Sequence, residues 1–355
     1  MRVLLIKTSS LGDVIHTLPA LTDAKRAIAD IQFDWVVEES FAEIPSWHPA
    51  VNEVIPVAIR RWRKNLWQTW KSGEWQAFKQ RLRAYNYDLV IDAQGLLKSA
   101  WLTRYVKAPI AGLDKLSARE PMASRFYQNS YSVAWGQHAV ERVRQLFAQA
   151  LNYQLPTTMG DYGLDRQRVI GNLQGNDPYV VFLHGTTWDT KHWPVYYWRQ
   201  LAEILNQQNV CVKLPWGSDK EKLRAEQIAK DLVNVVVLPK LNLQGIAAVL
   251  AAARACVAVD TGLGHLAAAL DTPTISLFGP TNPELTGSYG KEQIHLIGNY
   301  PACIPCLKKE CTYQPTEQDK QLFDLNKEYP LCFTQVNPQQ VINHLSVLLN
   351  KKPIV

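Results

Sequence analysis

VLLIKTSSLGDVIHTLPAL, residues 3–21, indicates the fold: a short apolar run ends in a small polar turn, and a stretch with helical periodicity follows. An apolar run of this kind, bounded by turn residues and followed by a 3.6-residue period, is typical of a β-α unit. The same succession opens again at YVVFLHGTTWDTKHWP, residues 179–194. The sequence therefore predicts an α/β protein with two parallel sheets, each with helices on both faces.

The alternation of strands and helices fills both halves of the chain. In the first half the expected strands are Val3–Lys7, Phe33–Glu38, Val51–Pro56, Leu89–Ala93 and Pro109–Gly112, and the expected helices are Val14–Ala29 and Trp67–Ala84. In the second half the expected strands are Tyr179–His184, Val210–Leu214, Val235–Leu238, Cys256–Val259 and Thr274–Phe278. The expected helices there are Tyr196–Gln207, Ser218–Leu232, Leu243–Ala253 and Gly264–Leu270.

Weak periodicity over residues 154–178 marks the connection between the halves. We expect domains at residues 1–165 and 175–335, followed by a C-terminal segment, 336–355, with a helical pattern over Val336–Leu349. Ligands of open parallel sheets bind beyond the carboxyl ends of the strands. We therefore expect the active site in a cleft between the two domains.

Composition excludes several classes of protein. The 355 residues are 47% hydrophobic, which excludes a disordered chain, and no apolar run is long enough for a membrane span or a signal peptide. We therefore expect a cytoplasmic protein, and six cysteines in so long a chain are expected to be thiols or metal ligands. The turn after the first strand lacks the glycine fingerprint of a nicotinamide oxidoreductase.

The net charge of +6 is concentrated in one segment. Residues 60–83 contain eight basic side chains and one acidic one, together with four of the twelve tryptophans. Cations with amphipathic rings suit an anionic membrane surface, whereas a solvated helix face with aromatics in the core is the ordinary alternative. Nucleic acid is disfavoured because the rest of the chain is near neutral.

Three polar turns follow apolar strands. In the first, Asp13 either caps a helix or serves as a general base, and the small polar loop with Ser10 and Gly12 lets a ligand approach the helix end. In the second, Thr186, Thr187 and Lys191 form a possible anion cradle or only an N-capping loop. The third turn has two glycines that permit close approach of a diphosphate, and its expected site residues are Asp260, Thr261, Gly262 and His265. His265 alone could equally be a core or capping histidine.

Several stretches resemble the lipopolysaccharide heptosyltransferases. They include KTSSLGDVIHTLPAL (7–21), IPVAIRRWRKN (55–65), YDLVIDAQGLLKSA (87–100), AREPMAS (118–124) and VDTGLGHLAAALD (259–271). The resemblance runs from Met1 to about Gly290 and, at IRRWRK and AREP, is strongest to the type I members. It implies a glycosyltransferase B-type fold of two Rossmann-like domains and a C-terminal helix that returns to the first domain.

The resemblance also implies an activity: inverting transfer of L-glycero-D-manno-heptose from ADP-heptose to the inner Kdo of Kdo-lipid A, at the cytoplasmic face of the inner membrane. Transfer to heptose, as in type II members, is the alternative. By the same resemblance, Asp13 is the base and Lys191 lies near the donor phosphates, with Glu221 at the ribose and Leu241 at the adenine. The implied acceptor residues are Ser10, Gly12, Arg60, Arg61, Arg63, Lys64 and Arg119. No Asp-x-Asp motif ends a strand, so we expect no cofactor and no catalytic divalent metal.

The segment from Tyr300 to Phe333 departs from the type I pattern and is similar to a cysteine-containing loop of type II members. It contains Cys303, Cys306, Cys311 and Cys332. Four thiols could bind zinc, but only one Cys-x-x-Cys pair is present. Reduced thiols that order a loop are the alternative.

Overall fold

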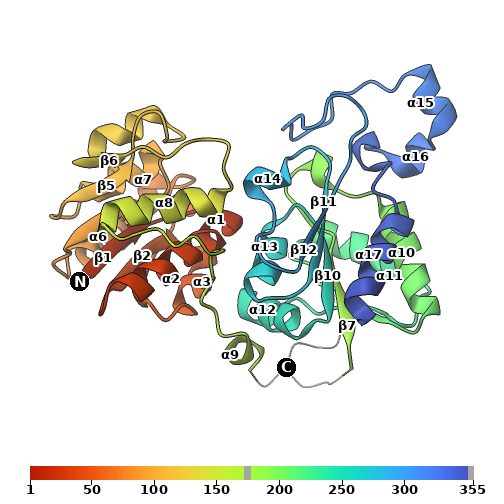
Figure 1. Cartoon of the computed structure of the whole chain (residues 1–355), viewed down its shortest axis with the longest axis horizontal. Coiled ribbons are helices and arrows are strands. Elements are labelled where there is room, and N and C mark those ends of the chain that lie inside the picture. Colours follow the sequence, from red (N-terminus) through yellow and green to blue (C-terminus); the bar gives the residue numbers. More distant parts are fainter. Residues whose placement is uncertain (172–176, 351–355) are drawn as a thin grey trace. The chain divides into compact units, whose positions relative to one another are not determined.

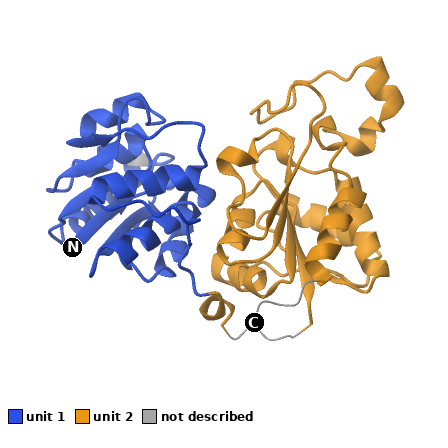
Figure 2. Ribbon diagram, viewed as in Figure 1, with its two compact units in different colours: residues 1–165 blue, residues 166–355 orange. Residues whose placement is uncertain are grey.

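The computed structural model describes residues 1–171 and 177–350. The chain divides into two compact units, residues 1–165 and 166–355 (Figure 2). The first unit ends at the residue where the sequence analysis ends the first domain. Residues 172–176 of the expected connection and 351–355 of the expected C-terminal segment lie outside the described residues. The described part of the connection contains a short helix, α9 (Arg166–Ile170).

The first unit is built on a six-stranded parallel sheet in the order β3-β2-β1-β4-β5-β6 (Figure 1). Its strands are β1 (Arg2–Ile6), β2 (Gln32–Glu38), β3 (Val51–Val57), β4 (Leu89–Asp92), β5 (Ile110–Leu113) and β6 (Asn129–Tyr131). Its helices are α1 (Leu11–Ile15), α2 (Leu18–Ala27), α3 (Glu43–Ser46), α4 (Ile59–Trp62), α5 (Leu66–Lys71), α6 (Glu74–Leu82), α7 (Leu97–Thr103) and α8 (Ala139–Leu151). Two short 3-10 helices are η1 (Glu39–Phe41) and η2 (Pro121–Phe126).

The second unit repeats this plan with the order β12-β11-β10-β7-β8-β9. Its strands are β7 (Tyr179–Leu183), β8 (Cys211–Leu214), β9 (Val235–Val237), β10 (Ala255–Val259), β11 (Thr274–Phe278) and β12 (Gln293–Ile297). Its other elements are η3 (Asp189–Lys191), α10 (Val195–Gln207), α11 (Asp219–Ala229), α12 (Leu243–Ala252), α13 (Gly262–Ala269), α14 (Pro283–Thr286), α15 (Glu317–Leu322), α16 (Leu325–Glu328), η4 (Leu331–Phe333) and α17 (Pro338–Asn350). Both strand orders are those of a Rossmann-like sheet, so the expected α/β class is confirmed.

Two expected helices are interrupted. The helix expected at Val14–Ala29 is divided into α1 and α2, because Pro19 fits only the first turn of a helix. The helix expected at Trp67–Ala84 is divided at Gly73, whose φ of 71° lies in the left-handed region. Strands β6 and β12 and helix α8 were not predicted.

The C-terminal helix corrects one expectation. α17 belongs to the second unit, whereas the resemblance implied that it returns to the first. Its buried Val341, Leu345 and Leu348 join the core that contains Trp198 and Leu201 of α10. The apolar face of α17 is therefore covered by its own unit. Among the described residues, no helix is both long and apolar enough to cross a membrane.

Candidate active site

Asp13 lies in the first turn of α1, directly after β1. Its Oδ2 accepts hydrogen bonds from the backbone N–H of Ser10 at 2.7 Å and from the Ser10 hydroxyl at 2.8 Å, so it does cap the helix. Burial alone would raise the pKa of Asp13, but the charge of Lys7 and the Ser10 hydrogen bonds lower it below its ordinary value. The carboxylate is therefore ionised at neutral pH.

Lys7 is the cation that stabilises this carboxylate. It is buried at the end of the β1 run, where its ammonium donates to the carbonyl of Ala93 at 2.9 Å. Burial lowers the pKa of Lys7, while the charges of Asp13 and Asp92 oppose that shift. A buried lysine whose pKa is shifted by burial and by the charges of two carboxylates marks this loop as a candidate functional site.

The loop between β1 and α1 is fixed by the turn after β4. The Gln94 side chain accepts from the N–H groups of Thr8 and Ser9 at 2.9 and 3.1 Å and donates to the Ser9 carbonyl at 2.7 Å. Lys98 of α7 donates to the Ser9 hydroxyl at 3.0 Å. These contacts hold the peptide that leads to Asp13, and Gln94 and Lys98 were not among the expected site residues.

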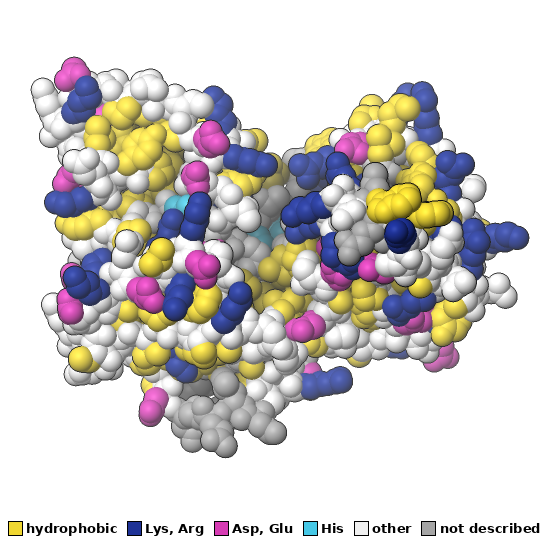
Figure 3. Space-filling view, turned by 180° about the vertical axis from the view of Figure 1, so that it is seen from behind, with side chains coloured by type: hydrophobic (Ala, Val, Ile, Leu, Met, Phe, Trp, Pro, Cys, Tyr) yellow, Lys and Arg dark blue, Asp and Glu magenta, His cyan; other side chains and the backbone are white. Residues whose placement is uncertain are grey.

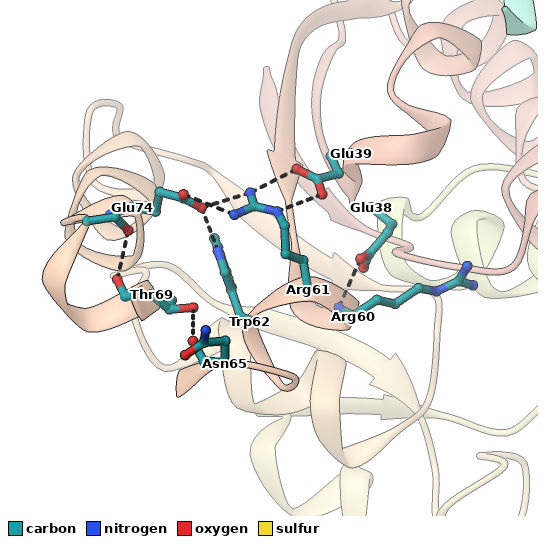
Figure 4. A network of polar contacts seen from close by, with 9 residues as sticks. Glu38, Glu39, Arg60, Arg61, Trp62, Asn65, Thr69 and Glu74 are labelled. Atoms are coloured by element: carbon teal, nitrogen blue, oxygen red, sulfur yellow. Dashed lines mark hydrogen bonds and ion pairs between the residues drawn. The ribbon is translucent and has the colours of Figure 1, made fainter. Parts of the chain in front are cut away.

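The basic residues expected at the acceptor differ in their surroundings (Figure 4). Arg61 is held between Glu39 at 3.1 Å and Glu74 at 2.8 Å, and its guanidinium lowers the pKa of Glu74 to about 2. The Arg60 backbone N–H donates to Glu38 at 3.0 Å, while its side chain points away from these carboxylates. Among the described residues, no carboxylate pairs with the guanidinium of Arg60 or Arg63.

The two carboxylates neutralise the charge of Arg61. Its ion pairs are therefore better explained as a structural link between Glu39 and Glu74 than as part of an acceptor site. Lys64 is exposed. Arg119 lies close enough to the polar loop for its charge to lower the pKa values of Lys7 and Asp13, behind the larger effects named above. On the face shown in Figure 3, Lys and Arg side chains lie among exposed apolar side chains.

In the second unit, Lys191 and Asp260 form an ion pair of 2.6 Å. The same carboxylate oxygen of Asp260 accepts from the Thr281 hydroxyl at 2.7 Å, and the Thr186 hydroxyl donates to the Asp260 backbone carbonyl at 3.1 Å. Two of the predicted polar turns are thus brought together at the carboxyl ends of β7 and β10. Thr187 is exposed beside them.

Helix α13 begins in the third polar turn. Thr261 is its N-cap and Gly262 its first residue, so the free amides of the helix end lie next to the Lys191–Asp260 pair. Gly264 packs closely on the sheet, since a Cβ there would come within 3.2 Å of the Ala258 side chain. His265 is buried in the first turn. The helix dipole and the lysine together favour an anion at this end.

Glu221 and Leu241 were expected around the nucleoside. Glu221 caps α11 and accepts from the N–H of Gly217 at 2.7 Å. A Cβ at Gly185 would come within 2.7 Å of the Glu221 carboxylate, so the side chain lies directly against the second polar turn. Leu241 is half-buried just before α12, and a Cβ at Gly245 of that helix would come within 3.5 Å of its side chain.

The cysteine-containing segment contacts the donor side. The carbonyls of Lys308 and Lys309 accept from the Thr190 hydroxyl and backbone N–H, and Leu307 N–H donates to the Pro280 carbonyl at 3.0 Å. Cys303 is exposed, and Cys306, Cys311 and Cys332 are partly buried free thiols. Within residues 1–171 and 177–350, no three His, Cys, Asp or Glu side chains are grouped to hold a metal.

Two Rossmann-like units, one with a carboxylate at a helix N-terminus and the other with a lysine and helix amides suited to a diphosphate, define a nucleotide-sugar glycosyltransferase. The model of glycosyltransferase family 9 (heptosyltransferase) matches residues 75–317. The chain belongs to this family, which confirms the resemblance seen in the sequence.

Individual relatives agree with this assignment. The chain is 70% identical over 350 residues to lipopolysaccharide heptosyltransferase 1 of Pseudomonas aeruginosa, covering 98% of both chains. The solved structure of E. coli heptosyltransferase WaaC with ADP is 55% identical, with a TM-score of 0.80 over 83% of this chain and 92% of that one. The same enzyme with ADP-2-deoxy-2-fluoro heptose is 54% identical, with a TM-score of 0.78 over 84% and 93%.

Proposed function

We propose that this heptosyltransferase moves L-glycero-D-manno-heptose from ADP-heptose to the inner Kdo of Kdo-lipid A, with inversion at the anomeric carbon. The observation that carries the proposal is the Asp13 carboxylate at the start of α1, which two hydrogen bonds from Ser10 hold in place. Its support on the donor side is the Lys191–Asp260 pair beside the α13 N-terminus. The names of the relatives, a lipopolysaccharide transferase and an enzyme solved with ADP, agree with both substrates.

On the acceptor side, Asp13 accepts the proton of the attacking Kdo hydroxyl as the new glycosidic bond forms. A carboxylate must lie within hydrogen-bond reach of that hydroxyl, and the loop that Gln94 and Lys98 hold fixes its position. Arg60, Arg63, Lys98 and Arg119 supply cations for the acceptor's carboxylate and phosphate groups. Ser10 and Gly12 border the same loop.

On the donor side, the departing ADP gains negative charge on its diphosphate. An ammonium has three donors, so Lys191 can contact a phosphate oxygen while it stays paired with Asp260. Thr186, Thr187 and the amides of Thr261 and Gly262 supply further donors, and such preorganised donors stabilise the transition state. Glu221 and Leu241 are assigned to the ribose and adenine, and His265 to the heptose.

No divalent metal takes part in this proposal, because the lysine and the helix amides stabilise the leaving group. Transfer is expected to survive exhaustive chelation. Activity that disappears with chelation and returns only with a divalent ion would contradict this assignment.

The reaction is tested by supplying ADP-heptose with Kdo-lipid A and comparing wild type, Asp13→Ala and Asp13→Asn. Wild type is expected to transfer heptose, and both variants are expected to lose about 10²–10⁴-fold in kcat. The side-chain oxygen of asparagine can still accept from the Ser10 N–H at this third helical position, so Asp13→Asn separates the base from the capping box. Undiminished turnover in Asp13→Asn would show that the carboxylate only caps α1.

The choice of acceptor is tested by comparing transfer to Kdo-lipid A with transfer to an acceptor that already carries one heptose. Preference for Kdo-lipid A is expected, whereas preference for the heptosylated acceptor would assign the type II reaction.

We also propose that the segment of residues 60–83 associates peripherally with an anionic membrane on its cytoplasmic face. Trp67 and Trp70 are exposed there, among the segment's cations.

A further inference from the structure

A cavity of about 720 Å³ opens in the first unit between α4, α5 and α7. This volume lies within the range of about 300–1,000 Å³ that is typical of ligand pockets. The donor-side residues are all in the second unit, whereas every residue that lines this cavity is in the first. It lies beside Arg63 and Lys98, which line it.

The inner wall of the cavity is aromatic and ordered. Trp75 stacks on Trp101 with ring centroids 5.3 Å apart and planes 11° apart, and it meets Trp62 edge-on at 5.5 Å. The Trp62 indole N–H donates to Glu74 at 2.8 Å, which fixes that ring. Eight of the eleven lining residues are apolar. The wall is therefore a preformed surface for an apolar ligand.

The outer edge leaves large apolar side chains in water. Trp70 is 70% exposed, Leu97 43% and Trp101 41%, and all three line the cavity. Apolar groups gathered at an open hollow indicate a binding site more often than single exposed side chains do. An apolar ligand would remove this surface from water.

The polar edge of the cavity connects to the proposed base. Lys98 lines the cavity and donates to Ser9, four residues before Asp13 in the same loop. Burial lowers the pKa of Lys98, and the charges of Arg60 and Arg63 lower it further, while those of Glu38 and Asp13 oppose the shift. Arg63 and Lys98 both line the cavity. An anionic group bound by them would lie between the cavity and Asp13.

We propose that the cavity binds one fatty acyl chain of the lipid-linked acceptor while its anionic sugar is held at Lys98 and Asp13. Charge complementarity identifies this occupant, because an apolar cavity with cations at one edge fits an amphiphile with an acidic head. The inference rests on the proposed lipid acceptor and extends it, since it assigns the enzyme a subsite for the lipid as well as for the sugar.

The test compares Kdo-lipid A with the same acceptor after complete deacylation, in detergent without vesicles. The variants are Leu97→Ser and Trp70→Ala. Their matched controls are Leu116→Ser and Trp135→Ala, which change exposed side chains of the first unit that do not line the cavity. Each cavity variant is expected to raise KM for the acylated acceptor at least fivefold and to leave KM for the deacylated acceptor unchanged. Both controls should behave as wild type with both acceptors.

A binding measurement keeps this test separate from the transfer reaction. Lysophosphatidic acid with a brominated chain, kept below its micelle concentration, should quench the tryptophan fluorescence of wild type saturably, and Leu97→Ser should weaken that binding at least fivefold. If wild type transfers to neither acceptor but quenching behaves in this way, the proposed function fails and the acyl site stands. Equal effects of the cavity variants on both acceptors, or quenching that Leu97→Ser does not change, would overturn the acyl site.

Discussion

Asp13 combines a structural contact with the chemical role that we propose for it. Its Oδ2 caps α1 through Ser10, and the same hydrogen bonds help keep the carboxylate ionised. Because its pKa lies below the ordinary value, protonation of Asp13 does not limit activity until the pH falls below the usual range of an aspartate. The acid limb of the kcat/KM profile should therefore lie at low pH.

Lys7→Met tests this relation. Removal of the buried charge is expected to raise the pKa of Asp13 and to move the acid limb to higher pH, with less effect at pH 8. The pH profile of kcat/KM measures the shift, and Lys115→Met makes the same substitution at an exposed lysine of the first unit. An acid limb at the wild-type position, in a variant shown by thermal unfolding to be folded, would refute the role of Lys7.

At the scale of elements, the donor site depends on a segment that is distant in sequence. The backbone carbonyls of Lys308 and Lys309 accept hydrogen bonds from Thr190, which directly precedes Lys191 in η3. The cysteine-containing segment thus fixes the position of the lysine that we assign to the diphosphate.

Thr190→Val removes the hydroxyl of this contact and keeps the shape of the side chain. The substitution removes one buried hydrogen bond, which contributes about 1 kcal/mol. We therefore expect the KM for ADP-heptose to rise about fivefold and trypsin to cleave faster at Lys308 or Lys309. Thr334→Val is the control, because its hydroxyl donates to the carbonyl of Leu331, three residues away in sequence. An unchanged KM together with unchanged cleavage would show that the segment does not support η3.

At the scale of the whole molecule, the excess of positive charge is local. Residues 60–83 hold eight basic side chains against one acidic one, while the chain as a whole carries +6. Arg61 is paired with Glu39 and Glu74, so the cations available to a surface include Arg60, Arg63 and Lys64. Such an arrangement favours attachment to anionic lipid that weakens as salt screens the charges.

Vesicle sedimentation measures this attachment. The triple change Arg60→Gln, Arg63→Gln, Lys64→Gln is expected to reduce binding to anionic vesicles at least tenfold at 0.1 M salt, since each basic residue near the surface contributes about 1 kcal/mol. The control carries Lys220→Gln, Lys222→Gln and Lys230→Gln, which removes as much charge from exposed positions of the second unit. Equal binding by the two triple variants would refute the surface assignment.

The sequence by itself determined the fold class, the division near residue 165 and the three polar turns, because apolar runs and turn residues are local signals. It also indicated the family through contiguous motifs. It missed β6, whose residues Asn129–Tyr131 form no apolar run, and the break at Gly73.

Tertiary structure decided which charges remain available and which are already paired. Only the folded chain shows that Arg61 is held by Glu39 and Glu74, that Lys7 is buried beside Asp13, and that α17 packs on α10. These facts depend on side chains that are distant in sequence, and hydrogen bonds, burial and electrostatics act through space. A pattern along the chain could identify the residue types but could not determine their partners.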